Sequence, residues 1–270
     1  MEFESILFLG TGGWTPHHNR QTTSIALAGA PTLVILDAGT GIGRLLDPAL
    51  APLISGCNRV CIILSHFHLD HTVGLSVLPG LFFGRQVRIY GPGPACSSHG
   101  TADMLRRLIG PPLFGLPLDK FPMDLEIHDL APGVNDVGDG VSVTVRVQPH
   151  VDPSIGIRLD RQRVAFVTDT ACADETVDFI EGCTVLLHDS FYDDEDMVRL
   201  SATPEGTIRL REHGDASGVA DIARRARVER AYLIHVNPEY PPDRVEAMHR
   251  AASRTFPSLF LPADLDRVAL

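Results

Sequence analysis

The chain has 270 residues, of which 44% are hydrophobic and 21% are charged. This composition is typical of a folded globular protein and excludes wholesale disorder. The formal net charge of -11 argues against a broad basic surface for nucleic acid. No apolar run approaches the roughly 18 residues that would indicate a membrane span. The first four residues, Met1-Glu2-Phe3-Glu4, carry acids where a signal peptide carries bases, so we expect a cytoplasmic protein.

Short apolar runs bounded by turn residues predict strands in the first third of the chain. A helix is predicted over Ala95–Leu108, before Gly110-Pro111-Pro112, since these residues cannot continue it. Residues 110–124 are rich in proline and apolar side chains without a clear period, so we expect a long loop that forms a lid or a contact in a homodimer. The predicted strands are Ser5–Leu9, Ser24–Ala28, Thr32–Leu36, Val60–Leu64 and Val87–Tyr90.

Strands and helices alternate again after a loop-like stretch at residues 131–140. This pattern predicts an α/β layered sandwich in which two strand-rich halves share one core. We expect one domain, residues 1–270, whose halves meet near 130–140. The predicted strands are Val141–Val147, Ile155–Leu159, Val164–Thr168, Thr184–Leu187 and Ala231–Ile234, and the helices lie around Asp174–Ile180, Ser217–Arg227 and Arg244–Ala252.

Three histidines and an aspartate, all potential metal ligands, lie close together directly after a predicted buried strand. They form the segment Ser65-His66-Phe67-His68-Leu69-Asp70-His71. His66 and His68 alternate as on an extended chain and can face one side. Asp70 and His71 can face a second point nearby. Four ligands from six residues would crowd one tetrahedral ion, so the spacing favours two borderline cations.

This segment, preceded by a strand that ends in Asp37-Ala38-Gly39, resembles the motif of the metallo-β-lactamase fold superfamily. The resemblance implies a four-layer αβ/βα sandwich and a set of further ligands at later strand ends. It implies that one metal ion is held by His66, His68 and His150, that a second is held by Asp70, His71 and His235, and that Asp169 bridges the two. Either zinc, which we expect first, or manganese or iron suits this set of donors.

Two acidic residues resemble the carboxylates that orient ligand imidazoles in this superfamily. Asp37 lies at the end of a predicted strand, where it could equally cap a turn. Asp189 lies in Leu187-His188-Asp189-Ser190, where relatives carry an acidic group. Both are predicted to act behind the ligands and to fix their tautomers.

Three details point to the phosphodiesterase branch, which includes ribonuclease Z and cyclic phosphate phosphodiesterases. The redox diiron branch has a carboxylate where this chain has His68, and the true β-lactamases have a cysteine where it has Asp169. The segment around His213 resembles the phosphodiesterase branch, and this resemblance implies that His213 is a general acid or a phosphate contact. We assign catalysis to His213 and Asp70.

Substrate contacts are predicted at two further positions. The turn Thr11-Gly12-Gly13 can approach a site closely because glycine lacks a side chain, and Arg20 beyond it suits a phosphate. Ser217 is the other candidate, although either Asp215 or Ser217 is expected to cap the following helix.

The resemblance also bears on the substrate. Ribonuclease Z has a long basic arm between the positions that match His150 and Asp169, where this chain has only 18 residues. With the negative net charge, this argues against tRNA. We therefore expect a dinuclear phosphodiesterase for a small or cyclic phosphodiester. Three alternatives remain: a thioester or lactone acyl hydrolase or cyclase, a ribonuclease Z-like nuclease without the arm, and a ligand-sensing protein that kept the fold.

Overall fold

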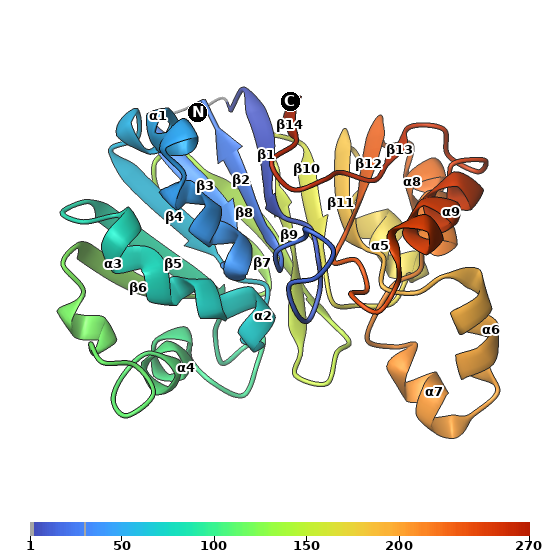
Figure 1. Cartoon of the computed structure of the whole chain (residues 1–270), viewed down its shortest axis with the longest axis horizontal. Coiled ribbons are helices and arrows are strands. Elements are labelled where there is room, and N and C mark those ends of the chain that lie inside the picture. The colour runs from blue at the N-terminus through green and yellow to red at the C-terminus, as the bar shows by residue number, and fades with distance from the viewer. Residues whose placement is uncertain (1–2, 30) are drawn as a thin grey trace.

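The computed structural model describes residues 3–29 and 31–270. Met1 and Glu2, which belong to the acidic N-terminal run, lie outside the described residues. Two seven-stranded sheets face each other, and Figure 1 shows helices on the outer face of each. Within the described residues, no helix is long and apolar enough to cross a membrane.

The first sheet has the order β14-β1-β2-β3-β4-β5-β6, and β3, β4, β5 and β6 run parallel to one another. Its strands are β1 (Ser5–Gly10), β2 (Ser24–Ala28), β3 (Thr32–Leu36), β4 (Arg59–Ile63), β5 (Gln86–Pro92), β6 (Asp124–Leu130) and β14 (Arg267–Ala269). The helices of this half are α1 (Ala51–Ser55), α2 (Leu69–Thr72), α3 (Leu78–Leu81) and α4 (Thr101–Leu108).

The second sheet has the order β13-β12-β11-β10-β9-β8-β7, and its strands β10 to β13 are parallel. The strands are β7 (Gly133–Asp136), β8 (Ser142–Gln148), β9 (Ser154–Leu159), β10 (Val164–Val167), β11 (Val185–Asp189), β12 (Arg230–Ile234) and β13 (Leu259–Phe260). The helices are α5 (Asp174–Phe179), α6 (Asp194–Ser201), α7 (Pro204–Arg209), α8 (Ala216–Ala226) and α9 (Pro242–Ala252).

Alternation along the strands explains the four layers. In β1, Ile6 and Phe8 belong to the apolar cluster between the two sheets, whereas Leu7 and Leu9 pack beneath the helices of the first half. A third cluster lies between the second sheet and its helices, with Val167 and Val219 among its members. Because both faces of each sheet are covered at its centre, strands such as β1, β3 and β10 are buried along their whole length and are apolar on both faces. The predicted αβ/βα sandwich is confirmed.

Phe8 offers a test of the core between the sheets. Its side chain is fully buried, and its ring centroid lies 5.2 Å from that of Tyr232 on the opposite sheet. The substitution Phe8→Ala is expected to lower the free energy of unfolding by about 3–5 kcal/mol, because it leaves a cavity. Urea unfolding followed by circular dichroism measures this. Phe83→Ala, at a side chain that is 74% exposed, is the control, and equal losses in the two variants would contradict the assignment.

The Pro-rich segment at 110–124 was expected to form either a lid or a homodimer contact. None of its residues lines the cavity described below, so it is not a lid over the candidate site. Instead Leu118 and Phe121 are buried in the apolar cluster between the first sheet and its helices. Leu105 and Ile109 belong to the same cluster, and this packing anchors the segment to α4. Leu113 is 78% exposed, and its use in a homodimer contact stays a prediction.

Several elements also differ from the sequence prediction. The helix expected from Ala95 begins only at Thr101, because Asp129 accepts a hydrogen bond from the Thr101 backbone N–H and fixes the start there. The stretch expected to be loop-like contains β7, and β6 just before it was not predicted.

The last residues of the chain return to the first sheet. β14 pairs with β1 in antiparallel register. Just before it, the Asp264 carboxylate accepts hydrogen bonds from the Thr11 backbone N–H and hydroxyl and from the Gln21 backbone N–H. The C-terminal segment therefore anchors the glycine-rich N-terminal turn.

Candidate metal centre

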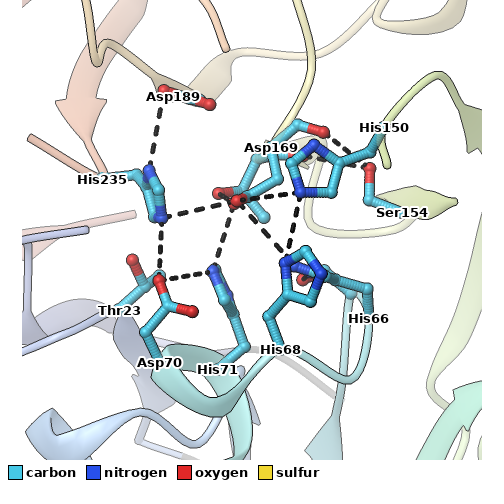
Figure 2. A network of polar contacts seen from close by, with 12 residues as sticks. Thr23, His66, His68, Asp70, His71, His150, Ser154, Asp169, Asp189 and His235 are labelled. Carbon is cyan, nitrogen blue, oxygen red and sulfur yellow. Dashed lines mark hydrogen bonds and ion pairs between the residues drawn. The ribbon is translucent and has the colours of Figure 1, made fainter. Parts of the chain in front are cut away.

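The predicted ligands converge at the carboxyl ends of parallel strands in the two sheets. His66 follows β4, Asp169 follows β10 and His235 follows β12. Figure 2 shows the side chains pointing toward one another from these strand ends, with Asp169 in the middle. All seven predicted ligand residues are brought together: His66, His68, Asp70, His71, His150, Asp169 and His235.

Backbone geometry at the strand ends contributes to this convergence. Asp37, Asp169 and His235 each follow a parallel strand and have positive φ angles of 57°, 50° and 53°. Non-glycine residues seldom adopt this left-handed conformation, and it is concentrated at functional sites. Asp169 and His235 point into the cluster (Figure 2), and Asp37 contacts His71 behind it.

The first ligand group consists of His66, His68, His150 and Asp169, whose donor atoms all lie within 4.8 Å of one another. His150 Nε2 lies 3.3 Å from His68 Nδ1. His66 Nε2 and His150 Nε2 each lie 3.8 Å from Asp169 Oδ2. Three imidazole nitrogens thus face a common point beside one carboxylate oxygen.

The second ligand group consists of Asp70, His71 and His235. Asp70 Oδ2 lies 3.3 Å from His71 Nε2 and 3.2 Å from His235 Nε2. Asp169 reaches this group as well, because its Oδ1 lies 3.2 Å from His71 Nε2 and its Oδ2 lies 3.5 Å from His235 Nε2. Asp169 therefore stands between the two groups, where a bridging ligand is expected.

Unsatisfied polar atoms indicate that these groups fit divalent metal ions. His66 Nε2 and His71 Nε2 are buried and have no hydrogen-bond partner. A buried polar atom without a partner is costly, and one metal ion in each ligand group would satisfy these two nitrogens. Imidazole nitrogens with carboxylate oxygens are donors that zinc, manganese and iron accept. The cluster is thus suited to bind divalent metal.

Electrostatics keep the carboxylates of the cluster charged. Burial alone would raise the pKa of Asp169, but His235, His71 and His66 hold it well below its usual range. Burial would also raise the pKa of Asp70, but His71 and His235 lower it below its usual range. Burial alone would lower the pKa of His235, but Asp169 and Asp70 raise it to about 9. Two charged carboxylates thus compensate the positive charge gathered in this centre.

Asp37 lies behind the second ligand group. The carboxylate is fully buried and accepts hydrogen bonds from the Ser65 backbone N–H at 2.7 Å and the Ser65 hydroxyl at 2.8 Å. Its Oδ2 lies 2.6 Å from His71 Nδ1. A proton on Nδ1 that is donated to Asp37 leaves Nε2 of His71 free to face the centre.

Asp189 supports the predicted general acid. Its Oδ2 lies 2.8 Å from His213 Nδ1, and its Oδ1 lies 3.8 Å from His235 Nδ1. The His213 ring stacks on the ring of Phe191, at a centroid distance of 4.4 Å, and on that of His235, at 5.2 Å. These contacts fix the imidazole so that Nε2 is the nitrogen left to face a substrate.

A cavity of about 500 Å³ opens over the centre. His68, Asp70, His150 and His213 contribute to its lining. The predicted substrate contacts Arg20 and Ser217 do not. Arg20 lines a neighbouring cavity of about 380 Å³, and its guanidinium donates to the Thr11 hydroxyl and the Pro262 carbonyl.

Ser217 lies within the first turn of α8, beyond the cavity, while Asp215 caps that helix through the Gly218 backbone N–H. The capping alternative is therefore the one that the structure supports, with Asp215 as the cap.

Several residues that line the cavity were not predicted from the sequence, among them Trp14, Phe191 and Arg209. Trp14 lies in the glycine-rich turn, whose close approach was expected, but nothing in the sequence distinguishes its ring from a surface tryptophan. Arg209 belongs to α7, which has no apolar period that would have predicted it.

Gly13 tests the close approach of that turn. A Cβ on Gly13 would lie 2.6 Å from His235 Cε1 and Nδ1, and the His235 ring cannot withdraw because it stacks on His71 and His213. We expect Gly13→Ala to displace His235, remove metal from the second group and lower kcat/KM by about 10- to 100-fold. Metal analysis and kinetics test this. Gly43→Ala is the control because no atom lies within 4 Å of its added Cβ, and normal metal content in Gly13→Ala would contradict the prediction.

Two facing sheets covered by helices, with a histidine and aspartate cluster at the strand ends, define the metallo-β-lactamase class of fold. Residues 32–236 match the family described as "Beta-lactamase superfamily domain", and the chain belongs to this family. The resemblance predicted from the motif at 66–71 is therefore confirmed.

The chain is also similar to curated proteins and solved structures along its length. It is 29% identical to a ribonuclease Z of a Mycobacterium species, with 97% of this chain and 95% of the relative covered. It is 25% identical to the ribonuclease Z of Methanosarcina acetivorans, with 96% of each covered. The metallo-beta-lactamase fold protein YhfI of Bacillus subtilis has a TM-score of 0.74 at 15% identity, with both chains fully covered.

Proposed function

We propose that the protein is a dinuclear metal-dependent phosphodiesterase that hydrolyses a small or cyclic phosphodiester. The single observation that carries this proposal is the position of Asp169 between two ligand groups, with His213 beside them on the wall of the same cavity. The similarity to ribonuclease Z relatives, which act on phosphodiesters, supports the same bond type. Zinc is the metal we expect first, with manganese or iron as alternatives.

Each part of the reaction has a group in the cavity. The two ligand groups joined by Asp169 would hold a pair of divalent ions, which would supply water of lowered pKa and neutralise charge on the phosphoryl oxygens. As the water oxygen forms its bond to phosphorus, the phosphorus–oxygen bond to the leaving group breaks. The water releases one proton to the solvent, and His213 Nε2 donates one to the departing oxygen. Asp189 holds His213 Nδ1 and so keeps the donating nitrogen aimed at the leaving group.

Three features support a small substrate. β9 and β10 follow each other with only residues 160–163 between them, so no arm extends from this part of the chain. The cavity of about 500 Å³ lies in the range of about 300–1,000 Å³ that is usual for small-molecule sites. The net charge of -11 disfavours a long polyanion.

The first experiment measures hydrolysis of bis(p-nitrophenyl) phosphate by protein loaded with Zn²⁺, Mn²⁺ or Fe²⁺. We expect turnover that chelation removes and that metal restores, and we expect His68→Ala to abolish it. His128→Ala is the control, since His128 lies on β6 outside the cavity. If no loaded form hydrolyses any phosphodiester but thioesters or lactones are cleaved, the acyl hydrolase alternative holds instead.

A second candidate is a ribonuclease Z-like nuclease that works without the arm. It is favoured by the match to ribonuclease Z relatives over 95–97% of both chains. The discriminating assay uses a precursor tRNA with a 3′ trailer alongside small diesters. Removal of the trailer at a kcat/KM above that for small diesters would favour this candidate.

A further inference from the structure

The cavity over the centre has two walls that hydrolysis itself does not require. One wall is Trp14 in the N-terminal turn. The other is formed by α6 and α7, which contribute Arg199, Leu200 and Arg209. Figure 1 shows that α6 and α7 project away from the layer formed by α5, α8 and α9. These helices therefore shape the entrance of the cavity without covering the second sheet.

Trp14 is the only tryptophan in the chain, and its side chain is 64% exposed. Its backbone is nonetheless held firmly, with a positive φ of 56° and an N–H that donates to Asp70 Oδ2 at 2.8 Å. The neighbouring Gly13 N–H donates to the Val236 carbonyl at 3.0 Å. The backbone thus holds a large aromatic residue beside a predicted metal ligand, with the surface of its ring open. Such a ring is suited to stack on a flat aromatic group, and a base stacked in this way contributes about 1–3 kcal/mol.

Arg209 is the last residue of α7 and is exposed. Among the residues that the structure describes, no carboxylate lies within ion-pair distance of its guanidinium, whereas Arg199 is paired with Asp196 at 2.6 Å. Glu212 and Glu239 also line the cavity, and their carboxylates would repel an anionic group. Arg209, whose guanidinium has no ion-pair partner among the described residues, offsets this repulsion. A guanidinium binds a phosphate through two parallel hydrogen bonds.

We propose that the cavity selects a nucleoside phosphodiester that carries a second phosphate group. The reacting diester lies over the ligand groups, the base stacks on Trp14 and the second phosphate binds Arg209. This inference rests on the proposed phosphodiesterase function and adds the substrate class. It also assigns α7 and the N-terminal turn as the elements that determine specificity.

Binding is tested without turnover. The probe is thymidine 3′,5′-bisphosphate, which has no diester bond, added to metal-loaded protein while the fluorescence of Trp14 is recorded. Because the chain has a single tryptophan, every change in emission reports on this ring. We expect saturable quenching by the bisphosphate and none by inorganic phosphate at the same concentration. Absence of quenching at millimolar bisphosphate would overturn the stacking role of Trp14.

The role of Arg209 has a matched control on the same segment. Arg209→Ala is expected to weaken bisphosphate binding by about 10- to 100-fold, which corresponds to the loss of a charge-assisted contact. Arg211→Ala removes an exposed arginine two residues further along that does not line the cavity, and it is expected to bind normally. Equal losses in both variants would show a general charge effect and would overturn the assignment of Arg209.

Selectivity is tested with three diesters that share the p-nitrophenolate leaving group. They are methyl p-nitrophenyl phosphate, thymidine 5′-(p-nitrophenyl phosphate) and its 3′-phosphorylated form. We expect kcat/KM to rise along this series. Trp14→Ala should lower the ratio of the second to the first by about 5- to 100-fold, and Arg209→Ala should lower the ratio of the third to the second.

The two proposals fail in different ways. If the loaded protein cleaves none of the diesters, the proposed function is wrong, and the fluorescence titration still tests the binding pocket. If it cleaves the methyl ester as well as the nucleoside esters, and Trp14→Ala leaves the ratios unchanged, the phosphodiesterase stands and the substrate class is wrong.

Discussion

Asp169→Ala is expected to remove metal from both ligand groups and to abolish hydrolysis. Its carboxylate lies 3.2 Å from His71 and 3.5 Å from His235 on one side, and 3.8 Å from His66 on the other. Without it, neither group keeps a shared anionic ligand, and the clustered imidazoles lose the charge that compensates bound cations. Loss of an outer partner of a metal site already costs about 10- to 100-fold, so a larger fall in kcat/KM is expected here.

Two quantities are measured for the wild type and the variant: the metal content after exhaustive dialysis, and kcat/KM. We expect about two ions per chain in the wild type and less than one in Asp169→Ala. Asp178→Ala, which removes an exposed carboxylate from α5, is the matched control. Thermal unfolding of the metal-free forms shows whether the variant still folds, and Asp169→Asn keeps the shape if alanine does not. Retention of both ions and of the wild-type rate would contradict a bridging position.

His213→Ala is expected to slow hydrolysis most for substrates with poor leaving groups. An alkoxide needs a proton as it departs, and general acid catalysis contributes about 10²–10⁴-fold. p-Nitrophenolate departs without that help, so its release should fall far less. The ring of His213 is held by Asp189 and Phe191 and lines the cavity, which places it where a leaving oxygen would depart.

A series of diesters with leaving groups of increasing pKa tests this role. The plot of log kcat/KM against that pKa should be steeper for His213→Ala than for the wild type. His99→Ala, outside the cavity, should leave the slope unchanged. Asp189→Asn should give an intermediate slope because it disturbs the orientation of His213 without removing it. A uniform loss for every leaving group would indicate a binding contact instead of a general acid.

The ligand set was predictable because it depends on local rules. The motif at 66–71 carries its own spacing, and the resemblance to the superfamily assigned His150, Asp169 and His235 at later strand ends. In the structure Asp169 and His235 follow parallel strands, whereas His150 follows β8, which is antiparallel to both of its neighbours. The two supporting carboxylates were assigned from the same resemblance. Asp37 and Asp189 end parallel strands and were expected behind the ligands.

The residues that line the cavity beyond the ligands were not predictable because they depend on how separate loops meet. Arg20 is close in sequence to the glycine-rich turn, yet the Pro262 carbonyl and the Thr11 hydroxyl draw its guanidinium to another cavity. Helices α6 and α7 were missed because each has only two turns and polar composition, and such helices depend on tertiary contacts rather than on apolar periodicity. Strand β6 was missed because its half-exposed residues lack a continuous apolar run.

The return of β14 to the edge of the first sheet has a consequence for dividing the polypeptide. A cut between Leu130 and Gly133 would separate β6 from β7, but the C-terminal piece would retain a strand whose partner, β1, lies in the other piece. It would also carry away Asp264, which holds Thr11. Neither half is therefore a self-sufficient module, and the two pieces are expected to complement each other when mixed rather than to fold separately.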